Sequence, residues 1–236
     1  MNIIIGIISV IVMLSLLWQH QELKKFRVTQ YETKSPKVRS EIKIVLISDL
    51  HSFTYGINNQ PLLEAVRRAA PDMILIPGDL IVAKKAETYK TALDFVQALC
   101  RLSVPVFFSN GNHESKAKLP DSDSLDAFRQ YRGELERCGV RILNDESCML
   151  QAGGTMVRIS GLELPLTCYQ KGRKPYLKED ELMRRLGSAS KEHLQILLAH
   201  HPAFAEQYAG WGADLTVCGH NHGGLVCIPG LGSVIS

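Results

Sequence analysis

The chain lacks the cysteine spacings that form small metal and redox sites. Its cysteines include no Cys-x-x-Cys pair, so zinc-finger and redox motifs are excluded. Several of them lie in apolar runs, where a free thiol behaves as a small hydrophobic group. A disulfide framework is not expected in a domain this large, and the cysteine usage favours a reducing compartment. The cysteines are Cys100, Cys138, Cys148, Cys168, Cys218 and Cys227.

A strong excess of one charge is also missing. The net charge is only +3, and the chain has neither a long basic stripe nor aromatic residues interleaved with basic ones. A dedicated nucleic-acid binder is therefore not expected. The chain has no internal repeat and no low-complexity tract. Its content of 45% hydrophobic and 22% charged residues is typical of a globular protein, and residues 42–236 are enough to bury one full core.

What the chain does have is a series of metal-binding side chains that follow short apolar runs. The runs are rich in β-branched and aliphatic residues and are bounded by Gly, Pro or Asn, which predicts buried strands. They cover residues 42–48, 73–77, 104–109, 194–199 and 215–218. The side chains that follow them are Asp49, His51, Asp79, Asn112, His113, His200, His220 and His222. Because ligands bind at the edge of an open α/β sheet where strands end, we expect one site there.

The chemistry of these side chains indicates a centre of two divalent metal ions. Carboxylate, amide and imidazole ligands without a thiolate suit Mn²⁺, our first expectation, and also Fe or Zn²⁺. Asp79 is predicted to bridge, because a carboxylate has two oxygens and can bond two ions about 3.5–4 Å apart. The expected nucleophile is a hydroxide on the ions, since coordination lowers the pKa of water to about 7. Each motif alone would predict only a loop or turn; the ordered set of five predicts the site.

The residues and order of these motifs resemble those of the calcineurin-like metallophosphoesterases over roughly residues 42–228. The motifs are Ser48–His51, Gly78–Leu80, Gly111–Glu114, Leu198–Pro202 and Gly219–Gly224. They look most like the membrane-associated branch with YkuE-type and UDP-2,3-diacylglucosamine pyrophosphatase-type enzymes. The resemblance implies an α/β fold in which two sheets pack face to face with helices outside, and hydrolysis of phosphate esters or pyrophosphates.

The resemblance also implies roles for the site residues. The first ion would be held by Asp49, His51, Asp79 and His222, and the second by Asp79, Asn112, His200 and His220. His113 would remain free of metal and act as the catalytic proton donor. Glu114 is predicted to orient His113, and the alternative is a solvated surface acid. Ala83 departs from the pattern, because many relatives carry a second acid at this position.

Other segments predict the rest of the domain. Amphipathic helices are expected at residues 58–70, 87–101, 125–138 and 179–187. Strands of a second sheet are expected at residues 140–143, 149–151 and 156–160. The polar segment 115–124 and the basic, aromatic segment 164–178 are candidates for choosing the substrate, although such a run is more often a solvated loop.

The N-terminal segment is apolar. Residues 3–18 carry no charge, and as a helix they span about 24 Å against a hydrocarbon core of ~30 Å. We predict a transmembrane anchor at residues 1–21, a linker at 22–41 and the catalytic domain at 42–236. A cleaved signal peptide is the rival, but it would normally have a basic start and a small-x-small cleavage site. A buried core helix is the third possibility.

Basic residues flank only the C-terminal side of this segment. By the positive-inside rule they predict that the catalytic domain is cytoplasmic, and they would also attract anionic lipid. They are Lys24, Lys25, Arg27, Lys34, Lys37 and Arg39.

The sequence thus predicts a membrane-anchored, dinuclear-metal hydrolase of phosphate esters or pyrophosphates, with a lipid-linked or nucleotide-lipid substrate as a hypothesis. The alternatives are a general phosphodiesterase or nuclease, and an inactive metal-binding membrane scaffold. Relatives usually continue well past the last motif, whereas fourteen residues follow His222. We therefore expect that part of the second sheet is missing or that the C-terminus is truncated.

Overall fold

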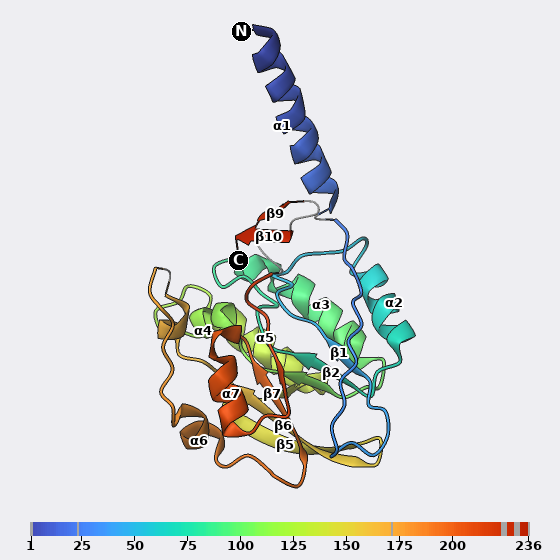
Figure 1. Ribbon diagram of the computed structural model, residues 1–236, viewed down its shortest axis with the longest axis vertical. Coiled ribbons are helices and arrows are strands. Elements are labelled where there is room, and N and C mark those ends of the chain that lie inside the picture. The colour runs from blue at the N-terminus through green and yellow to red at the C-terminus, as the bar shows by residue number, and fades with distance from the viewer. Residues whose placement is uncertain (1, 23, 171, 223–225, 229–231, 236) are drawn as a thin grey trace.

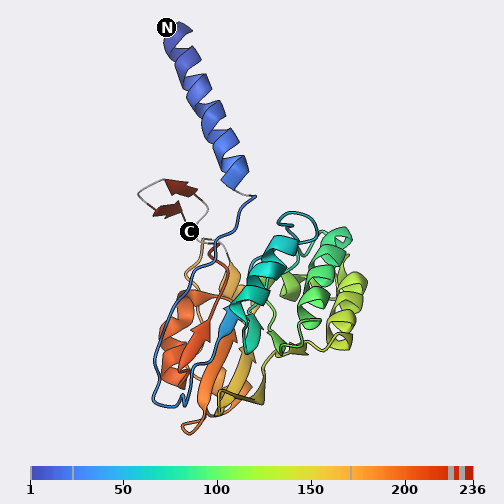
Figure 2. The same ribbon diagram turned by 90° about the vertical axis from the view of Figure 1, so that its right-hand side faces the viewer.

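Two four-stranded sheets pack face to face, and helices cover both outer faces (Figures 1 and 2). The computed structural model describes residues 2–22, 24–170, 172–222, 226–228 and 232–235. The α/β class and the two-sheet sandwich expected from the sequence are confirmed.

The first sheet is entirely parallel, in the order β1-β2-β3-β4. Its strands are short and are connected by helices, as parallel strands require. The strands are β1 (Ile44–Leu46), β2 (Met73–Ile76), β3 (Val106–Phe108) and β4 (Arg141–Ile142), and the helices between them are α2 (Gln60–Ala69), η1 (Ala86–Thr88), α3 (Tyr89–Cys100), α4 (Asn112–Ala117) and α5 (Leu125–Arg137).

The assignment of residues 140–143 to the second sheet is wrong. The middle two of these residues form β4, which pairs with β3 in the first sheet. The connection through α5 is a crossover, and a crossover connection returns the chain parallel to the strand it left. The chain changes sheets only after Leu143, at the turn formed by Asn144 and Asp145, which precedes β5. The other two predicted strands of the second sheet are correctly placed.

The second sheet has the order β5-β6-β7-β8 and is mixed. Strands β5 and β6 form an antiparallel hairpin, and β6, β7 and β8 are parallel. Its strands are β5 (Glu146–Ala152), β6 (Thr155–Leu162), β7 (Leu194–Ala199) and β8 (Leu215–Val217), and its helices are η2 (Leu166–Tyr169), α6 (Glu181–Leu186), η3 (Pro202–Phe204) and α7 (Ala205–Trp211). A separate antiparallel pair, β9 (Val226–Ile228) and β10 (Gly232–Ile235), follows.

The alternation of side chains along each strand divides the core into layers. In β2, Met73 and Leu75 belong to the cluster between the sheets, whereas Ile74 and Ile76 belong to the cluster under α2, α3 and α5. A third cluster lies between the second sheet and α6 and α7. Because β2 is buried on both faces, it is an uninterrupted apolar run. The helices cover the faces of the sheets and not the carboxyl ends of the parallel strands.

The predicted N-terminal helix is present as α1 (Asn2–Glu22), which extends away from the domain in both views (Figures 1 and 2). The apolar side chains that the structure describes in this helix are exposed; Leu14 and Leu17 are 57% and 55% exposed. The alternative of a buried core helix is therefore wrong. In the part of the chain that the structure describes, no helix has the length and apolar character needed to cross a membrane, so the predicted transmembrane anchor is not confirmed.

Candidate metal centre

The candidate ligands converge at the carboxyl edge of both sheets. The loops after β1 and β2 run side by side, because the amides of Asp49 and His51 donate to the carbonyls of Gly78 and Asp79, at 3.2 and 3.0 Å. A side chain on Gly111 would overlap the Asp79 carboxylate, which explains the glycine at this close approach. The amide of His220, in the loop after β8 of the second sheet, donates to Asp49 Oδ1 at 2.9 Å, so elements of both sheets meet at one place.

Several site residues adopt a backbone conformation that side chains disfavour. Positive φ angles are rare outside glycine and, at non-glycine residues, store strain that often accompanies function. The five site residues in this region, with φ between 47° and 75°, are Asp49, His51, Asp79, His220 and His222. The turns thus aim successive side chains at the same point instead of following a regular strand or helix.

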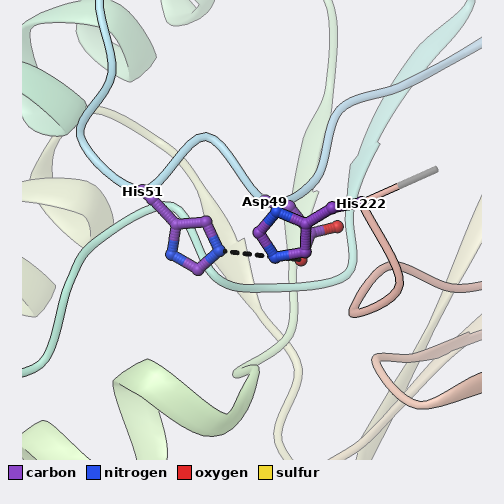
Figure 3. Close-up of side chains that lie close together, drawn as sticks. All are labelled: Asp49, His51 and His222. Atoms are coloured by element: carbon purple, nitrogen blue, oxygen red, sulfur yellow. Dashed lines mark hydrogen bonds and ion pairs between the residues drawn. The ribbon is translucent and has the colours of Figure 1, made fainter. Parts of the chain in front are cut away.

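Among the described residues, potential ligand atoms form three groups, and within each group the atoms lie within 4.8 Å of one another. They are Asp49 with His51 and His222, His51 with Asp79 and His113, and Asp79 with His200 and His220. Figure 3 shows the first group: the rings of His51 and His222 are stacked, and their Nε2 atoms are 3.0 Å apart. Asp79 belongs to two groups, which is the position expected of a bridging carboxylate.

The most buried ligands show why the site suits cations. His200 is fully buried, and its Nδ1 bonds to the Pro77 carbonyl at 2.9 Å. A carbonyl can only accept, so Nδ1 carries the hydrogen and the Nε2 lone pair faces Asp79 Oδ2, 3.1 Å away. Two acceptors this close need either a proton or a metal cation between them, because their lone pairs would otherwise repel each other. Asn112 Oδ1 is also buried and has no hydrogen bond within the described residues, so the donor set fits divalent ions.

The protonation states agree with a cation site. Burial raises the pKa of Asp79, but His200 and the His113 amide outweigh this effect and lower it to about 2. Burial lowers the pKa of His200, but the carboxylates of Asp79 and Asp49 outweigh burial and raise it, because a proton can occupy the place of an ion. Burial lowers the pKa of His51 and of His220, and neutral imidazoles are the form that binds metal.

His113 differs from the ligands. It lies in the first turn of helix α4, its amide donates to Asp79 Oδ1 at 2.8 Å, and its ring lies 4.8 Å from the ring of His51. Its Nδ1 accepts a hydrogen bond from the Ala83 amide at 3.0 Å. The remaining nitrogen, Nε2, therefore carries hydrogen and cannot bind metal in this tautomer. The geometry is consistent with the predicted separation of His113 from the ligand set.

Glu114 does not contact the His113 ring, so the predicted orienting role is wrong in its detail. Its side chain is fully buried, which also excludes the surface alternative. The carboxylate accepts hydrogen bonds from the amides of Asp79, Leu80 and Gly111 at 2.8, 2.9 and 3.0 Å. Glu114 thus fixes the backbone that presents Asp79. Burial and the Asp79 charge raise the pKa of Glu114 to about 7.

The sequence interpretation missed Glu163, at the end of β6. Its carboxylate accepts hydrogen bonds from Ser115 Oγ and Lys118 Nζ, both at 2.6 Å, and from Asn110 Nδ2 at 3.2 Å. These bonds attach the second sheet to the segment that carries Asn112. The only signal in the sequence is an acid after an apolar strand, and its partners lie about fifty residues away, so pattern alone could not identify the network.

The two segments expected to choose the substrate have separate environments. Ser115 and Ala117 belong to the buried part of α4 rather than to a polar loop. In segment 164–178, the Tyr169 ring lies 5.2 Å from the ring of His220 and 5.4 Å from that of His201. Tyr176 instead lines a surface cavity of about 510 Å³ beside α7. Lys171, Gly223 and Gly224 lie outside the described residues.

Comparisons with known proteins identify the family of the chain. A family model described as calcineurin-like phosphoesterase matches residues 42–224. The chain is 27% identical to the uncharacterized metallophosphoesterase Cj0846 of Campylobacter jejuni, covering 86% of this chain and 50% of that protein. It is 23% identical to the uncharacterized metallophosphoesterase YkuE of Bacillus subtilis, covering 92% and 72% of the two chains. The chain therefore spans only half the length of Cj0846.

A solved structure shares the fold. It is the phosphopantetheinyl hydrolase PptH of Mycobacterium tuberculosis, with a TM-score of 0.50, 17% identity, and coverage of 78% of this chain and 84% of that one. The chain belongs to the calcineurin-like phosphoesterase family. It is accordingly a metal-dependent phosphoester hydrolase, which confirms the resemblance and the enzyme class predicted from the motifs.

Proposed function

We propose that the protein hydrolyses a phosphate diester or pyrophosphate with two divalent ions, Mn²⁺ being our first choice. The observation that carries the proposal is the buried pair of facing acceptors, His200 Nε2 and Asp79 Oδ2, 3.1 Å apart. When bound, the ions would neutralise phosphoryl charge and lower the pKa of water. We propose the predicted division of ligands: Asp49, His51, Asp79 and His222 for one ion, and Asp79, Asn112, His200 and His220 for the other.

The residues of the chain then have distinct tasks. Asp79 joins the two halves of the centre, and Glu114 holds its loop through three short amide bonds. His113 Nε2–H would bond to an oxygen of the reacting phosphoryl group. Tyr169 packs against His220 at 5.2 Å, and we propose that it forms the wall against which the substrate lies. It is the part of segment 164–178 that we expect to choose the substrate.

The test combines metal content with hydrolysis of bis-p-nitrophenyl phosphate. We expect two ions per chain in the Mn²⁺-loaded parent, and a loss of roughly 10²–10⁴-fold in kcat for His113→Ala with both ions retained. His193→Ala is the matched control, because His193 bonds to Ser190 rather than to any site residue. A metal-loaded parent that turns over no phosphoester of several classes would favour the inactive scaffold.

We further propose that α1 attaches the enzyme to a lipid surface, with the catalytic domain on the cytoplasmic side and a lipid-linked substrate. Two observations support this proposal: the apolar side chains of α1 are exposed, and basic residues such as Lys24 and Lys25 follow it. Flotation with anionic vesicles should retain the full chain and lose the Leu14→Asp, Leu17→Asp variant. Equal flotation of the two proteins would contradict the attachment.

A further inference from the structure

Two cysteines outside the metal centre lie against each other at the ends of neighbouring helices. Cys100 is the last residue of α3, Cys138 is the C-cap of α5, and their Sγ atoms are 3.2 Å apart. Both residues are free thiols and are partly exposed. They are 38 positions apart in the chain, so only the folded structure brings the two sulfurs together.

The helices that carry these cysteines already pack side by side (Figures 1 and 2). Away from the cysteines, the rings of Tyr89 on α3 and Tyr131 on α5 lie 5.8 Å apart. Cys100 and Cys138 both pack against the buried cluster that these helices share. A disulfide bond is about 2.05 Å long, so the sulfurs would need to approach by only about 1 Å. Small rotations of the two side chains supply this movement and leave the helices in place.

The surroundings of the pair favour two thiols at rest and a disulfide on oxidation. Burial and the neighbouring Cys138 raise the pKa of Cys100 to about 12, so this sulfur keeps its hydrogen near neutral pH. Because both residues are partly exposed, a small oxidant can reach them. A cysteine that is oxidised to a sulfenic acid beside a second thiol condenses with it to a disulfide, and here the second thiol is in contact.

We propose that Cys100 and Cys138 are a modification site at which a peroxide forms a reversible disulfide. Two S–H bonds and the O–O bond of the peroxide break, and one S–S bond forms. The two sulfurs lose two electrons to the peroxide oxygens, which take up the two protons and, from hydrogen peroxide, leave as two molecules of water. A thiol reductant reverses the reaction by exchange.

The disulfide would close a loop that contains part of the metal centre. Asn112 and Glu114 lie between the two cysteines, in α4. A cross-link stabilises such a loop mainly because it restricts the unfolded chain. We therefore expect oxidation to stabilise the fold around the segment that holds Asp79, with little change in its native geometry. The inference does not rest on the proposed hydrolase function, and its tests do not require turnover.

Formation of the bond is tested with hydrogen peroxide on the reduced, metal-free, full-length protein. After alkylation of the remaining thiols, trypsin separates the two cysteines, because Arg101 and Arg137 lie between them. Mass spectrometry should show the peptides 91–101 and 138–141 linked, and dithiothreitol should release them. The same link should form in the control Cys148→Ser, since Cys148 lies on β5 in the second sheet. Recovery of Cys100 and Cys138 as separately alkylated or separately oxidised residues would overturn the inference.

The effect of the bond is tested by urea unfolding of oxidised and reduced protein. The midpoint of the parent should rise by roughly 1–2 M on oxidation, and the same rise is expected for Cys148→Ser. Cys100→Ser and Cys138→Ala should show no rise. Each variant is compared with its own reduced form, so any stability lost through the substitution cancels. An unchanged or lower midpoint in the linked parent would overturn the stabilising role, and a rise that persists in Cys100→Ser would contradict the assignment to this pair.

Discussion

The two halves of the proposed metal centre differ in their exposure to water. In the buried half, the side chains of Asp79 and His200 are 2% and 0% exposed. In the open half, the side chains of His51 and His222 are 20% and 41% exposed. Without ions, water can solvate the ligands of the open half, whereas the facing atoms of the buried half, His200 Nε2 and Asp79 Oδ2, are shielded from it. The buried half should therefore depend on bound ions more strongly, because unsolvated polar groups are costly.

Asp79→Asn should have the largest effect, because it removes the carboxylate that belongs to both halves. We expect both ions to be lost and kcat to fall by at least about 10³-fold. Metal analysis after gel filtration and hydrolysis assays would measure these losses. Asp94→Asn is the control, since Asp94 lies on α3 and pairs with Lys90 at 2.6 Å. An Asp79→Asn protein that keeps two ions would show that the halves are held separately.

His200→Ala and His222→Ala compare the halves directly. Loss of buried His200 removes the imidazole that lies 3.1 Å from Asp79 Oδ2, so excess metal should not restore activity. Loss of exposed His222 should lower the affinity for one of the two ions by roughly 10–100-fold. Excess Mn²⁺ should then restore activity, because water can replace the lost imidazole as a ligand. Activity as a function of metal concentration distinguishes the two. The same metal dependence in both variants would show that exposure does not set the contribution of a ligand.

Glu114→Gln should have a smaller, mainly structural effect on the buried half. The amide group of glutamine would place a donor against backbone amides that now donate to Glu114. We expect the free energy of unfolding of the metal-free protein to fall by about 1–3 kcal/mol. Urea unfolding would measure it, with Glu134→Gln on the surface of α5 as the control. An unchanged unfolding midpoint would mean that the Asp79 loop is held by other contacts.

Lys118→Met should have the smallest effect and tests pH dependence. Burial raises the pKa of Glu163, but the bonds from Lys118, Ser115 and Asn110 outweigh it and lower the pKa. A lowered pKa in the folded state stabilises the protein above the unfolded value near 4.5, and this contribution disappears as pH falls through the folded pKa. Since Lys118 is 41% exposed, screening limits the loss to about 0.5–1 kcal/mol at pH 7.

Urea unfolding at pH 7 and pH 3 would measure this difference between the parent and Lys118→Met. The difference should be larger at pH 7, where Glu163 is ionised in both states of the protein. Lys90→Met is the control, since the pair of Lys90 with Asp94 is exposed on a helix surface. A difference that grows at low pH would contradict the assigned role of Glu163.

The strands that carry the site could be predicted because each is a short apolar run with a sharp end. The five predicted runs correspond to β1, β2, β3, β7 and β8. Burial on both faces makes the runs of β2, β3 and β7 continuous, which is a local signal. The sheet to which a strand belongs is not local, and the error at residues 140–143 shows this. Nothing in a short run of apolar residues distinguishes an edge position beside β3 from a place in the second sheet.

The helices, like the strands, could be predicted from a local pattern. The predicted ranges 58–70, 87–101 and 125–138 correspond to α2, α3 and α5, because an amphipathic pattern is local to the helix. Contacts between one helix and another could not be predicted from the amphipathic pattern. The sulfurs of Cys100 and Cys138 lie 3.2 Å apart at the ends of α3 and α5, although no cysteine motif in the sequence joins them.

The sequence by itself determined the family, the apolar strands and the set of metal-binding side chain types, because each depends on residues that are near one another in the chain. The tertiary structure alone decided which ligands are buried, which acids hold the site together and which nitrogen of His113 carries hydrogen. Those properties depend on partners far apart in sequence: Ala83 with His113, Glu114 with Asp79, and Glu163 with Lys118. Burial and hydrogen bonding set protonation and tautomer, and both exist only once the chain has folded.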